Sequence, residues 1–347
     1  MALKLFSADN IPQGLNLMVS QAYTPGIFAQ YSGWPGICWQ YSGDSAKATS
    51  DGYLTFQASN ANALGGWMSK VSDIRGASAT QSWLGFRYKN TVAFMTGPLV
   101  FVSATTSGTT QTVLLTMAQV RTAGFGALNE EDYIEVFLDS TNQVYQVWIN
   151  GVKVLSGSFA ANSYPATGAG YVWVACASAG LGAAGAFGIR DVYWMDIDSV
   201  DTARLGPIHS VPATIAVTGS EYVVTGAASL QAAVTTALQN PPTATPNALS
   251  PADKQPLTAT LSTSLGSTIP ILAIQGQISA GGTASAPGGV DMSLTDGTHT
   301  TDLGVVSLPD ATMLYNRYAP NIARTAPDGS AWTVAKVNTM SLLATPQ

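Results

Sequence analysis

The chain has 347 residues, a formal net charge of −6 and charged side chains at only 10% of its positions. This length exceeds the size at which a single hydrophobic core usually stops growing, so we expect two domains. Because no run of Lys or Arg occurs, the sequence argues against a nucleic-acid footprint and against a basic patch for anionic membranes. The 34 glycines and the sparse charge favour a strand-rich, turn-rich protein over one with long exposed helices.

The N-terminal segment MALKLFSADNIPQG lacks the continuous apolar stretch of a signal peptide, and nowhere do about 18 apolar residues follow one another. We therefore expect a protein that is made in the cytoplasm and does not span a membrane. Cys38 and Cys176 each lie in an apolar, strand-like run. Since a cytosolic origin disfavours disulfides, we favour two buried free thiols over a bridge.

Candidate strands alternate with clusters of Gly, Ser, Asn and Asp over residues 1–208, which is the pattern of an all-β sandwich. This part of the chain is rich in aromatic residues and poor in cysteine, and its proportions favour an antiparallel jelly roll. The strands expected in chain order are residues 37–41, 53–57, 83–88, 99–103, 113–117, 133–138, 143–149, 152–158, 170–177 and 190–198.

Residues 133–158 specify their own strand pairing most completely. Asn150-Gly151 tolerates the positive φ angles of a two-residue hairpin turn, and residues 139–142 form a second turn cluster. Counting outward from the two turns predicts the pairs Ile149–Val152, Val147–Val154, Val136–Tyr145 and Ile134–Val147. The face expected to be buried carries Val136, Tyr145, Val147, Ile149, Val152 and Val154. The face expected to be half-covered or exposed carries Tyr133, Glu135, Phe137, Trp148 and Lys153.

Residues 190–198 alternate strongly and are expected to close the sandwich. Tyr193, Met195 and Ile197 should point to one side, and Trp194, Asp196 and Asp198 to the other. A shift in composition follows, because the first 208 residues hold 27 of the 31 aromatic residues but only 6 of the 18 prolines. We place a domain boundary near residues 205–207, where Gly and Pro would end the strand. Residues 1–208 are assigned to the jelly roll and residues 209–347 to a smaller β-rich domain.

The second domain is expected to contain one or two helices among its strands. Leu230, Val234 and Leu238 lie at four-residue spacing, which predicts a helix near residues 227–239, and a Pro-rich connector follows at 240–256. The terminal run 330–343 fits either a helix or a strand, and its apolar spacing favours a helix. Further strands are expected at residues 257–262, 269–279, 290–294 and 301–306.

Three segments carry a resemblance: YIEVFLDSTNQVYQVWINGVKV, RDVYWMDIDSVDTARLGPIHSV and PDGSAWTVAKVN. Together they resemble virion structural proteins of tailed bacteriophages, of the tail-fibre, collar or head-decoration type, with a concanavalin A/laminin-G-like jelly roll. The resemblance implies a non-enzymatic structural component of the virion, with other virion proteins as partners. A lectin-like module that binds a host-surface glycan is the alternative, and a glycoside hydrolase is the third hypothesis.

We also expect the chain to form a homo-oligomer. The second domain has only four aromatic residues, which limits the core that it can build alone, and its sparse charge leaves few ionic groups to keep monomers apart. Symmetric association would bury such a surface. The choice of a trimer comes from the resemblance to fibres.

The densest acidic group consists of Asp191, Asp196, Asp198 and Asp201, and it raises the question of glycoside hydrolysis. Sandwich glycanases carry paired catalytic carboxylates, but the stretch WMDIDSVD contains no Glu. We interpret these four residues as solvated carboxylates at a strand end. No catalytic residue is predicted, and the chain is not expected to be an enzyme.

No cofactor or metal is expected, with calcium as the open alternative. Asp139, Asn142 and the loop 196–201 could offer hard oxygen ligands, although a turn-forming role explains Asp139 and Asn142 without a metal. His209 and His299 stand alone in the sequence, so neither a zinc site nor a catalytic triad is indicated. We interpret both histidines as surface or linker residues.

The remaining candidates for a binding site are two Gly-rich runs and four tryptophans. Residues 179–188 and 280–289 lack the Lys and the βαβ context of a phosphate-binding loop. Four tryptophans could stack on sugars, yet tryptophan in a sandwich more often fills the core or an interface. These four are Trp34, Trp39, Trp67 and Trp83.

Overall fold

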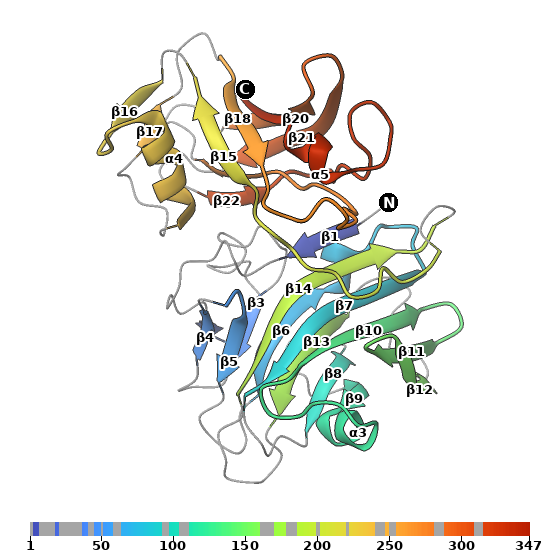
Figure 1. Cartoon of the computed structure of the whole chain (residues 1–347). Coiled ribbons are helices and arrows are strands. Elements are labelled where there is room, and N and C mark those ends of the chain that lie inside the picture. The colour runs from blue at the N-terminus through green and yellow to red at the C-terminus, as the bar shows by residue number, and fades with distance from the viewer. Residues whose placement is uncertain are drawn as a thin grey trace. The chain divides into compact units, whose positions relative to one another are not determined.

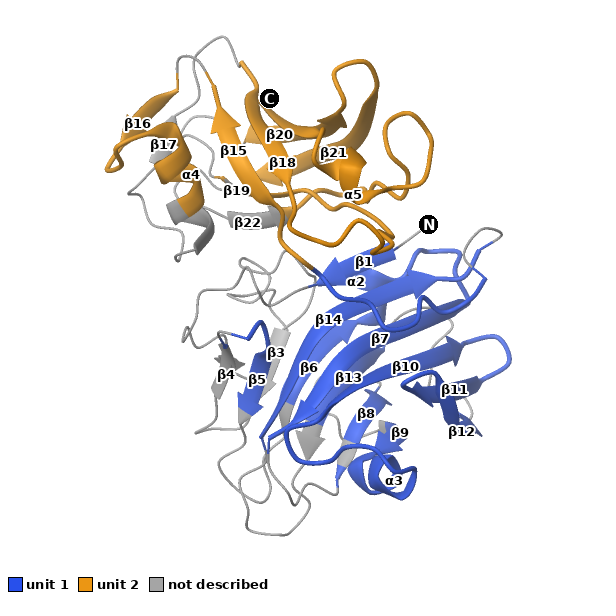
Figure 2. Cartoon of the chain, viewed as in Figure 1, with its two compact units in different colours: residues 1–9, 13–29, 34–210 blue, residues 10–12, 30–33, 211–347 orange. Residues whose placement is uncertain are grey.

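The structure is a computed structural model that describes residues 3–6, 18–20, 37–40, 45–49, 51–57, 64–91, 97–103, 111–159, 170–177, 186–198, 202–219, 222–239, 247–249, 255–280, 288–308 and 315–347. This part of the chain is mainly β, with antiparallel sheets and short helices, which confirms the predicted fold class. The chain divides into two compact units, one of residues 1–9, 13–29 and 34–210 and one of residues 10–12, 30–33 and 211–347 (Figure 2).

The first unit is a jelly-roll-like sandwich of two sheets. In the view of Figure 1, the strands around β14, β7 and β10 lie in front of those around β6, β13 and β8. The eight-stranded sheet has the order β12 (Val152–Ser158), β11 (Val144–Ile149), β10 (Glu131–Asp139), β7 (Gln81–Asn90), β14 (Ala186–Asp196), β5 (Leu54–Gln57) and β4 (Ser45–Ala48), and β1 (Leu3–Phe6) also pairs with β14. The six-stranded sheet has the order β2 (Met18–Ser20), β3 (Ile37–Gln40), β6 (Leu64–Lys70), β13 (Tyr171–Ala177), β8 (Pro98–Ser103) and β9 (Gln111–Thr116). All of these pairs are antiparallel except β2 with β3.

Two short helices interrupt the strands of this unit. α2 (Val71–Ile74) follows β6 directly, and α3 (Met117–Thr122) follows β9. The side chain of Thr116 accepts a hydrogen bond from the Gln119 backbone N–H, and the Gln119 side-chain oxygen accepts one from the Thr116 backbone N–H, which forms a capping box. This reciprocal pair satisfies backbone donors that the start of a helix would otherwise leave free.

The two faces of the eight-stranded sheet carry different side chains. One, here called the apolar face, includes Leu84, Phe86, Ile134, Val136 and Val147, which are all fully buried. The other, here called the mixed face, carries the residues that alternate with them along the same strands, including Trp83, Arg87, Tyr133, Glu135 and Tyr193. Since side chains alternate across a strand, the period of two in the sequence separates the two sets.

The predicted meander is present, but one of its registers differs from the prediction. Val136 pairs with Val147 and Ile134 with Ile149, two residues away from the expected partners Tyr145 and Val147. The Asp139 carboxylate accepts hydrogen bonds from the backbone N–H groups of Thr141 and Asn142, so the turn lies beyond Asp139 and the strand is longer than predicted. A shift of two residues preserves the face of every side chain.

The edge strand β12 departs further from the prediction. Ile149 pairs with Val152 as predicted, but the register shifts at Val147, which pairs with Leu155 and not with Val154. The side chain of Val152 is 55% exposed, and Val154 and Tyr145 are half-buried. The prediction that these three side chains are buried is therefore wrong, because β12 ends the sheet and is only partly covered.

The second unit is built around a five-stranded antiparallel sheet with the order β15 (Thr214–Thr218), β18 (Leu257–Ser262), β23 (Ser341–Pro346), β20 (Gly288–Thr295) and β21 (Thr300–Leu308). Two further pairs are β16 (Val223–Thr225) with β17 (Asn247–Leu249) and β19 (Gln277–Ala280) with β22 (Tyr315–Tyr318). Its helices are α4 (Leu230–Gln239), within the predicted helical segment, and α5 (Val334–Val337). The core gathers Met292, Leu294, Leu303 and Trp332, whose indole N–H donates to the Ala323 carbonyl over 2.8 Å.

Two predictions for this unit are wrong in part. The run 330–343 contains only the short helix α5, and β23 follows from Ser341, where it pairs with both β18 and β20. Pairing on both sides outweighs the helical spacing of the local sequence. Of the expected strand 269–279, only residues from Gln277 onward form β19, and Ile269 and Leu272 are about half-exposed. None of the helices in the described residues has the length and apolar character required to cross a membrane.

Candidate functional site

A short stretch of chain covers the mixed face of the first unit. After β14 the chain doubles back along the sheet (Figure 1), and we call residues 204–210 the exit segment. Leu205 and Ile208 of this segment pack in one apolar cluster with Trp83, Tyr133 and Tyr193 of the sheet. The exit segment therefore covers Tyr133 and Glu135, which are buried, while Phe137 and Trp148 are half-buried and Lys153 is exposed, as predicted for a half-covered face.

Glu135 is the first polar anchor beneath the exit segment. Its side chain is completely buried, and it pairs with Arg204, whose Nη1 lies 2.5 Å from Oε2. The other carboxylate oxygen accepts hydrogen bonds from the Tyr193 hydroxyl over 2.7 Å and from the Gly206 backbone N–H over 2.9 Å. The guanidinium of Arg204 also lies over the Trp148 ring, 4.7 Å from its centroid. A buried carboxylate that has all of these partners is held in one geometry.

Asp191 is the second polar anchor. It lies at a register shift in β14 with a positive φ of 52°, which turns its side chain to the mixed face. Its Oδ2 lies 3.2 Å from Nε of Arg87 and 3.0 Å from Nδ1 of His209, and its Oδ1 accepts the Ser210 N–H over 2.9 Å. Arg87 in turn donates to the Ile208 carbonyl over 3.1 Å.

Two buried tyrosines complete the cluster. The Tyr133 hydroxyl donates to the Asp191 carbonyl, and Leu205 N–H donates to the Tyr193 hydroxyl. Burial raises the pKa of Tyr193, and the neighbouring Glu135 carboxylate raises it further. Burial, followed by the charges of Glu135 and Asp191, likewise raises the pKa of Tyr133. The ring of Tyr193 lies flat over Gly85, where an added Cβ would be 2.1 Å from it.

Side chains of the mixed face bind the backbone of the exit segment. Side chains of the sheet bind the N–H groups of Leu205, Gly206 and Ser210 and the carbonyl of Ile208. Leu205 and Ile208 pack into the apolar cluster, while Pro207 is exposed and His209, although exposed, turns Nδ1 to Asp191.

The structure separates the four aspartates that the sequence grouped. Asp191 lies on the mixed face, whereas Asp196 accepts hydrogen bonds from Ser82, Trp194 and the Gly76 N–H on the opposite side of the sheet. Both carboxylates are buried, at 1% and 3% exposure, so the prediction of solvated carboxylates is wrong for these two. Asp198 is half-buried, and Asp201 lies outside the described residues. Asp191 and Asp196 lie on opposite faces of the sheet and therefore do not form a carboxylate pair.

Asp139 and Asn142 form a turn. Burial acts to raise the pKa of Asp139, but hydrogen bonds from Asn142 and Gln81 outweigh it and hold the pKa below its ordinary value. Among the described residues, no group of three or more His, Cys, Asp or Glu side chains is placed to hold a metal ion. His299 contacts Asp296 in an exposed turn, at 3.1 Å.

The other sequence candidates contribute little to this site. Trp67 is fully buried and Trp83 is 8% exposed within the apolar cluster, as expected for core tryptophans. The side chains of Trp34, Trp39, Cys38 and Cys176, together with most of both Gly-rich runs, lie outside the described residues. Sequence reasoning missed Arg87, Arg204 and the anchoring role of Glu135. The signal in the sequence that could have revealed Glu135 is a carboxylate that alternates with apolar residues in the strand 131–139.

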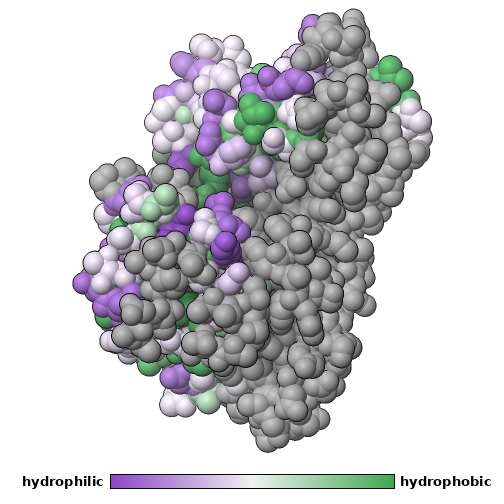
Figure 3. All heavy atoms as spheres, turned by 180° about the vertical axis from the view of Figure 1, so that it is seen from behind, coloured by the Kyte–Doolittle hydropathy of each residue, from purple (hydrophilic) through white to green (hydrophobic). Residues whose placement is uncertain are grey.

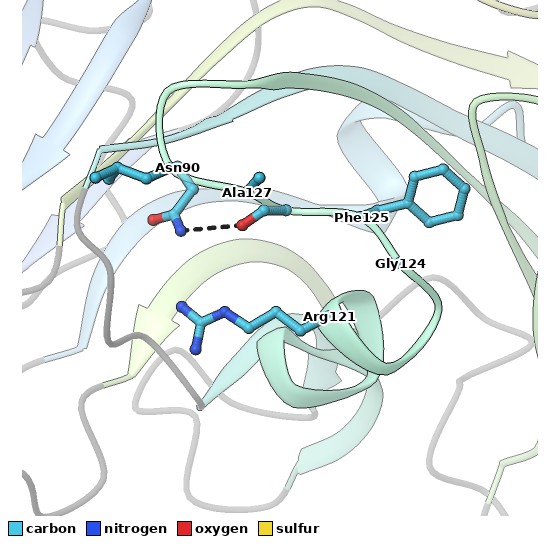
Figure 4. A pocket seen from close by; sticks show the side chains of 7 residues that line it. Asn90, Arg121, Gly124, Phe125 and Ala127 are labelled. Atoms are coloured by element: carbon cyan, nitrogen blue, oxygen red, sulfur yellow. Dashed lines mark hydrogen bonds between the residues drawn. The ribbon is translucent and has the colours of Figure 1, made fainter.

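One shallow pocket lies elsewhere on the first unit. Its volume is about 350 Å³, and it is lined by Arg121 of α3, by residues 124–128 and by Asn90. The Arg121 side chain extends toward Asn90, which donates to the Gly126 carbonyl over 3.3 Å, while the Phe125 ring points the other way (Figure 4). The described atoms in Figure 3 form a mosaic of hydrophilic and hydrophobic side chains.

No protein-family model matches the chain, and no curated protein matches it. Among solved structures, an alginate lyase in complex with alginate trisaccharide is 13% identical, with a TM-score of 0.35 over 57% of this chain and 99% of the lyase. A sialidase is 11% identical, with a TM-score of 0.31 over 46% of this chain and 17% of its own. The binding domain of botulinum neurotoxin serotype D is 7% identical, with a TM-score of 0.29 over 79% and 74%.

These similar structures correct one prediction. Alginate lyases and a sialidase are enzymes, which contradicts the prediction that the chain is not an enzyme. The error was to conclude from the type of protein that catalysis is absent, although one fold hosts many unrelated functions. Identities of this size and TM-scores below 0.5 assign no activity, ligand or partner to this chain.

Proposed function

We propose that the chain is a structural component of a tailed-phage particle that acts through protein–protein contacts. The observation that carries this proposal is the mixed face, where two buried carboxylates, an arginine and a tyrosine bind polypeptide backbone. The three sequence segments that resemble virion proteins support the location in a particle. The chain would be made in the host cytoplasm, associate with itself, with a trimer as the preferred state, and contact other virion proteins.

The proposal is tested by locating the chain in particles. Mass spectrometry of purified virions should detect it in stoichiometric amounts, and cryo-electron microscopy should place two β-rich units in the fibre, collar or head. Light scattering on the recombinant chain at tens of micromolar should give the mass of an oligomer. Absence from purified virions would overturn the structural role, and a monomer under these conditions would overturn the trimer.

The pocket beside Arg121 favours a second candidate, a module that binds an acidic glycan. A guanidinium at the edge of a shallow hollow suits a carboxylate, because its fork of N–H donors matches that group. A bound saccharide would raise the melting temperature, since it stabilises only the native state. Screening uronate-containing oligosaccharides by thermal shift tests this candidate. Arg121→Ala should abolish the shift and Lys153→Ala, an exposed control, should retain it, whereas no shift with any saccharide contradicts the candidate.

A further inference from the structure

We propose that the mixed face is a peptide-recognition site that binds residues 204–210 of a second copy of this chain. The inference deepens the proposed function and rests on it, since it names the contact through which copies associate. In the structure the face holds the chain's own exit segment, and the same contacts would form with the segment of a neighbour. Exchange of identical elements between protomers is a common route to symmetric association.

The contacts of the exit segment are those of a bound peptide. Among the described residues, no backbone–backbone hydrogen bond joins residues 204–210 to the sheet. Backbone bonding comes instead from side chains of Glu135, Tyr193, Arg87 and Asp191. Because these groups belong to the sheet and their partners to the segment, the face keeps its binding groups whichever copy provides the peptide.

Charge and shape make the face selective for this segment. Arg204 meets the buried Glu135, and His209 meets the buried Asp191. Leu205 and Ile208, three residues apart, fill the apolar cluster between these charged ends. A peptide without the leading Arg would leave the buried Glu135 without its counter-charge, which is costly, and a peptide without the apolar pair would bury less apolar surface.

The chain before the segment is long enough for exchange. The ladder between β14 and β7 ends at Asp196, and the Ile197 N–H still donates to the Gln81 carbonyl over 2.9 Å, so six residues, 198–203, separate it from Arg204. Extended chain reaches at most roughly 3.3–3.6 Å per residue, so six residues could reach about 20–22 Å. Exchange over this reach would leave every strand of the sandwich in place.

The first experiment asks whether the face binds the segment in trans. In the full chain, Leu205→Ala with Ile208→Ala weakens the internal segment and leaves the face intact. A fluorescein-labelled peptide of residues 202–211 should bind this variant about tenfold or more tightly than it binds the wild type, whose face is occupied, as measured by anisotropy. A peptide with Ala at positions 205 and 208 is the control. Equal or absent binding to variant and wild type overturns the proposal.

Should the double variant not fold, Arg204→Ala alone keeps the comparison possible: Glu135 loses its counter-charge, which weakens the segment, but it keeps the Tyr193 hydroxyl and the Gly206 N–H as hydrogen-bond donors. This variant should also bind the labelled peptide more tightly than the wild type does. Circular dichroism and the melting temperature establish in each case that the sandwich is intact. A folded Arg204→Ala chain that fails to bind the peptide overturns the proposal as well.

The second experiment distinguishes exchange between copies from binding within one copy. A Glu135→Ala chain, with a defective face and an intact segment, is co-expressed under a different tag with the Leu205→Ala, Ile208→Ala chain. The two should co-purify, whereas two differently tagged copies of the segment variant should not. Peptide binding without co-purification would overturn the exchange. Failure to find the protein in virions would leave both binding results unchanged and would overturn only the role in a particle.

Discussion

Both faces of the eight-stranded sheet carry buried side chains, but different chemistry holds them in place. The apolar face carries Leu84, Phe86, Ile134 and Val136, and its stabilisation is non-directional and scales with the area removed from water. The mixed face carries Glu135, Arg87, Asp191 and Tyr193, and each must meet a particular atom of residues 204–210. The apolar face therefore stabilises the sandwich by its buried area, whereas the mixed face fixes the position of the exit segment by directional bonds.

This difference bears on what the buried polar groups contribute to stability. Replacing a buried ion pair with apolar side chains is often neutral, whereas removing one partner is strongly destabilising. The pair of Glu135 and Arg204 is therefore better understood as a device for recognition than as a source of net stability. Substitutions on each face should distinguish the stability that the apolar face provides from that of the mixed face.

The largest effect is expected on the apolar face. Val147→Asp places a carboxylate where no polar partner is available and should prevent soluble expression, because burying an unpaired charge costs many kcal/mol. Soluble yield and circular dichroism measure the outcome. Lys153→Glu, on the exposed strand β12, is the matched control and should be mild. A well-folded Val147→Asp protein would contradict the assignment of the apolar face.

A smaller but still strong effect is expected at the buried anchor. Glu135→Ala should lower the free energy of unfolding by about 3–5 kcal/mol, since it leaves Arg204 and the Gly206 N–H without their carboxylate partner. Denaturant titration measures the loss, and exposed Glu130→Ala should change little. In a double-mutant cycle, Arg204→Ala should cost much less in the Glu135→Ala background than alone. Additive losses would show that the two side chains do not interact.

Gly85→Ala tests the close approach between sheet and tyrosine. The added Cβ would lie 2.1 Å from the Tyr193 ring, so the ring must move and its bond to Glu135 is disturbed. We expect a loss of about 1–3 kcal/mol, the usual cost of overpacking. Gly288→Ala, whose Cβ would meet nothing within 4 Å, should be neutral. Equal stability of the two variants would refute this reading of the mixed face.

The smallest effect should be the dependence on alkaline pH. Tyr133 and Tyr193 have pKa values raised in the folded state by burial, so above the ordinary tyrosine pKa of about 10 only the unfolded chain loses these protons. Stability is then fully present below pH 10 and falls as the pH rises further, because the unfolded state binds fewer protons. Absorbance of tyrosinate should show these two groups titrating only with unfolding, and early reversible titration would count against their burial.

Local patterns predicted most of the strands but not their exact partners. Asn150-Gly151 forms the expected hairpin with φ angles of +48° and +85°, because few dipeptides adopt that conformation easily. The neighbouring turn was misplaced, since the bonds of Asp139 to Thr141 and Asn142 moved the pairing by two residues. The terminal helix failed because β23 is paired on both sides by distant strands.

Which side chains share a face can be read from the sequence, because alternation along a strand is a local property that does not depend on the partner strand. Alternation separates Tyr193 and Met195 from Trp194 and Asp196, and Glu135 from Val136. Contacts between distant segments come from the folded chain alone: Glu135 meets Arg204, 69 residues along the chain, and Asp191 meets Arg87 because β14 pairs with β7. Such contacts depend on how distant segments pack, and no period or motif in the local sequence records that packing.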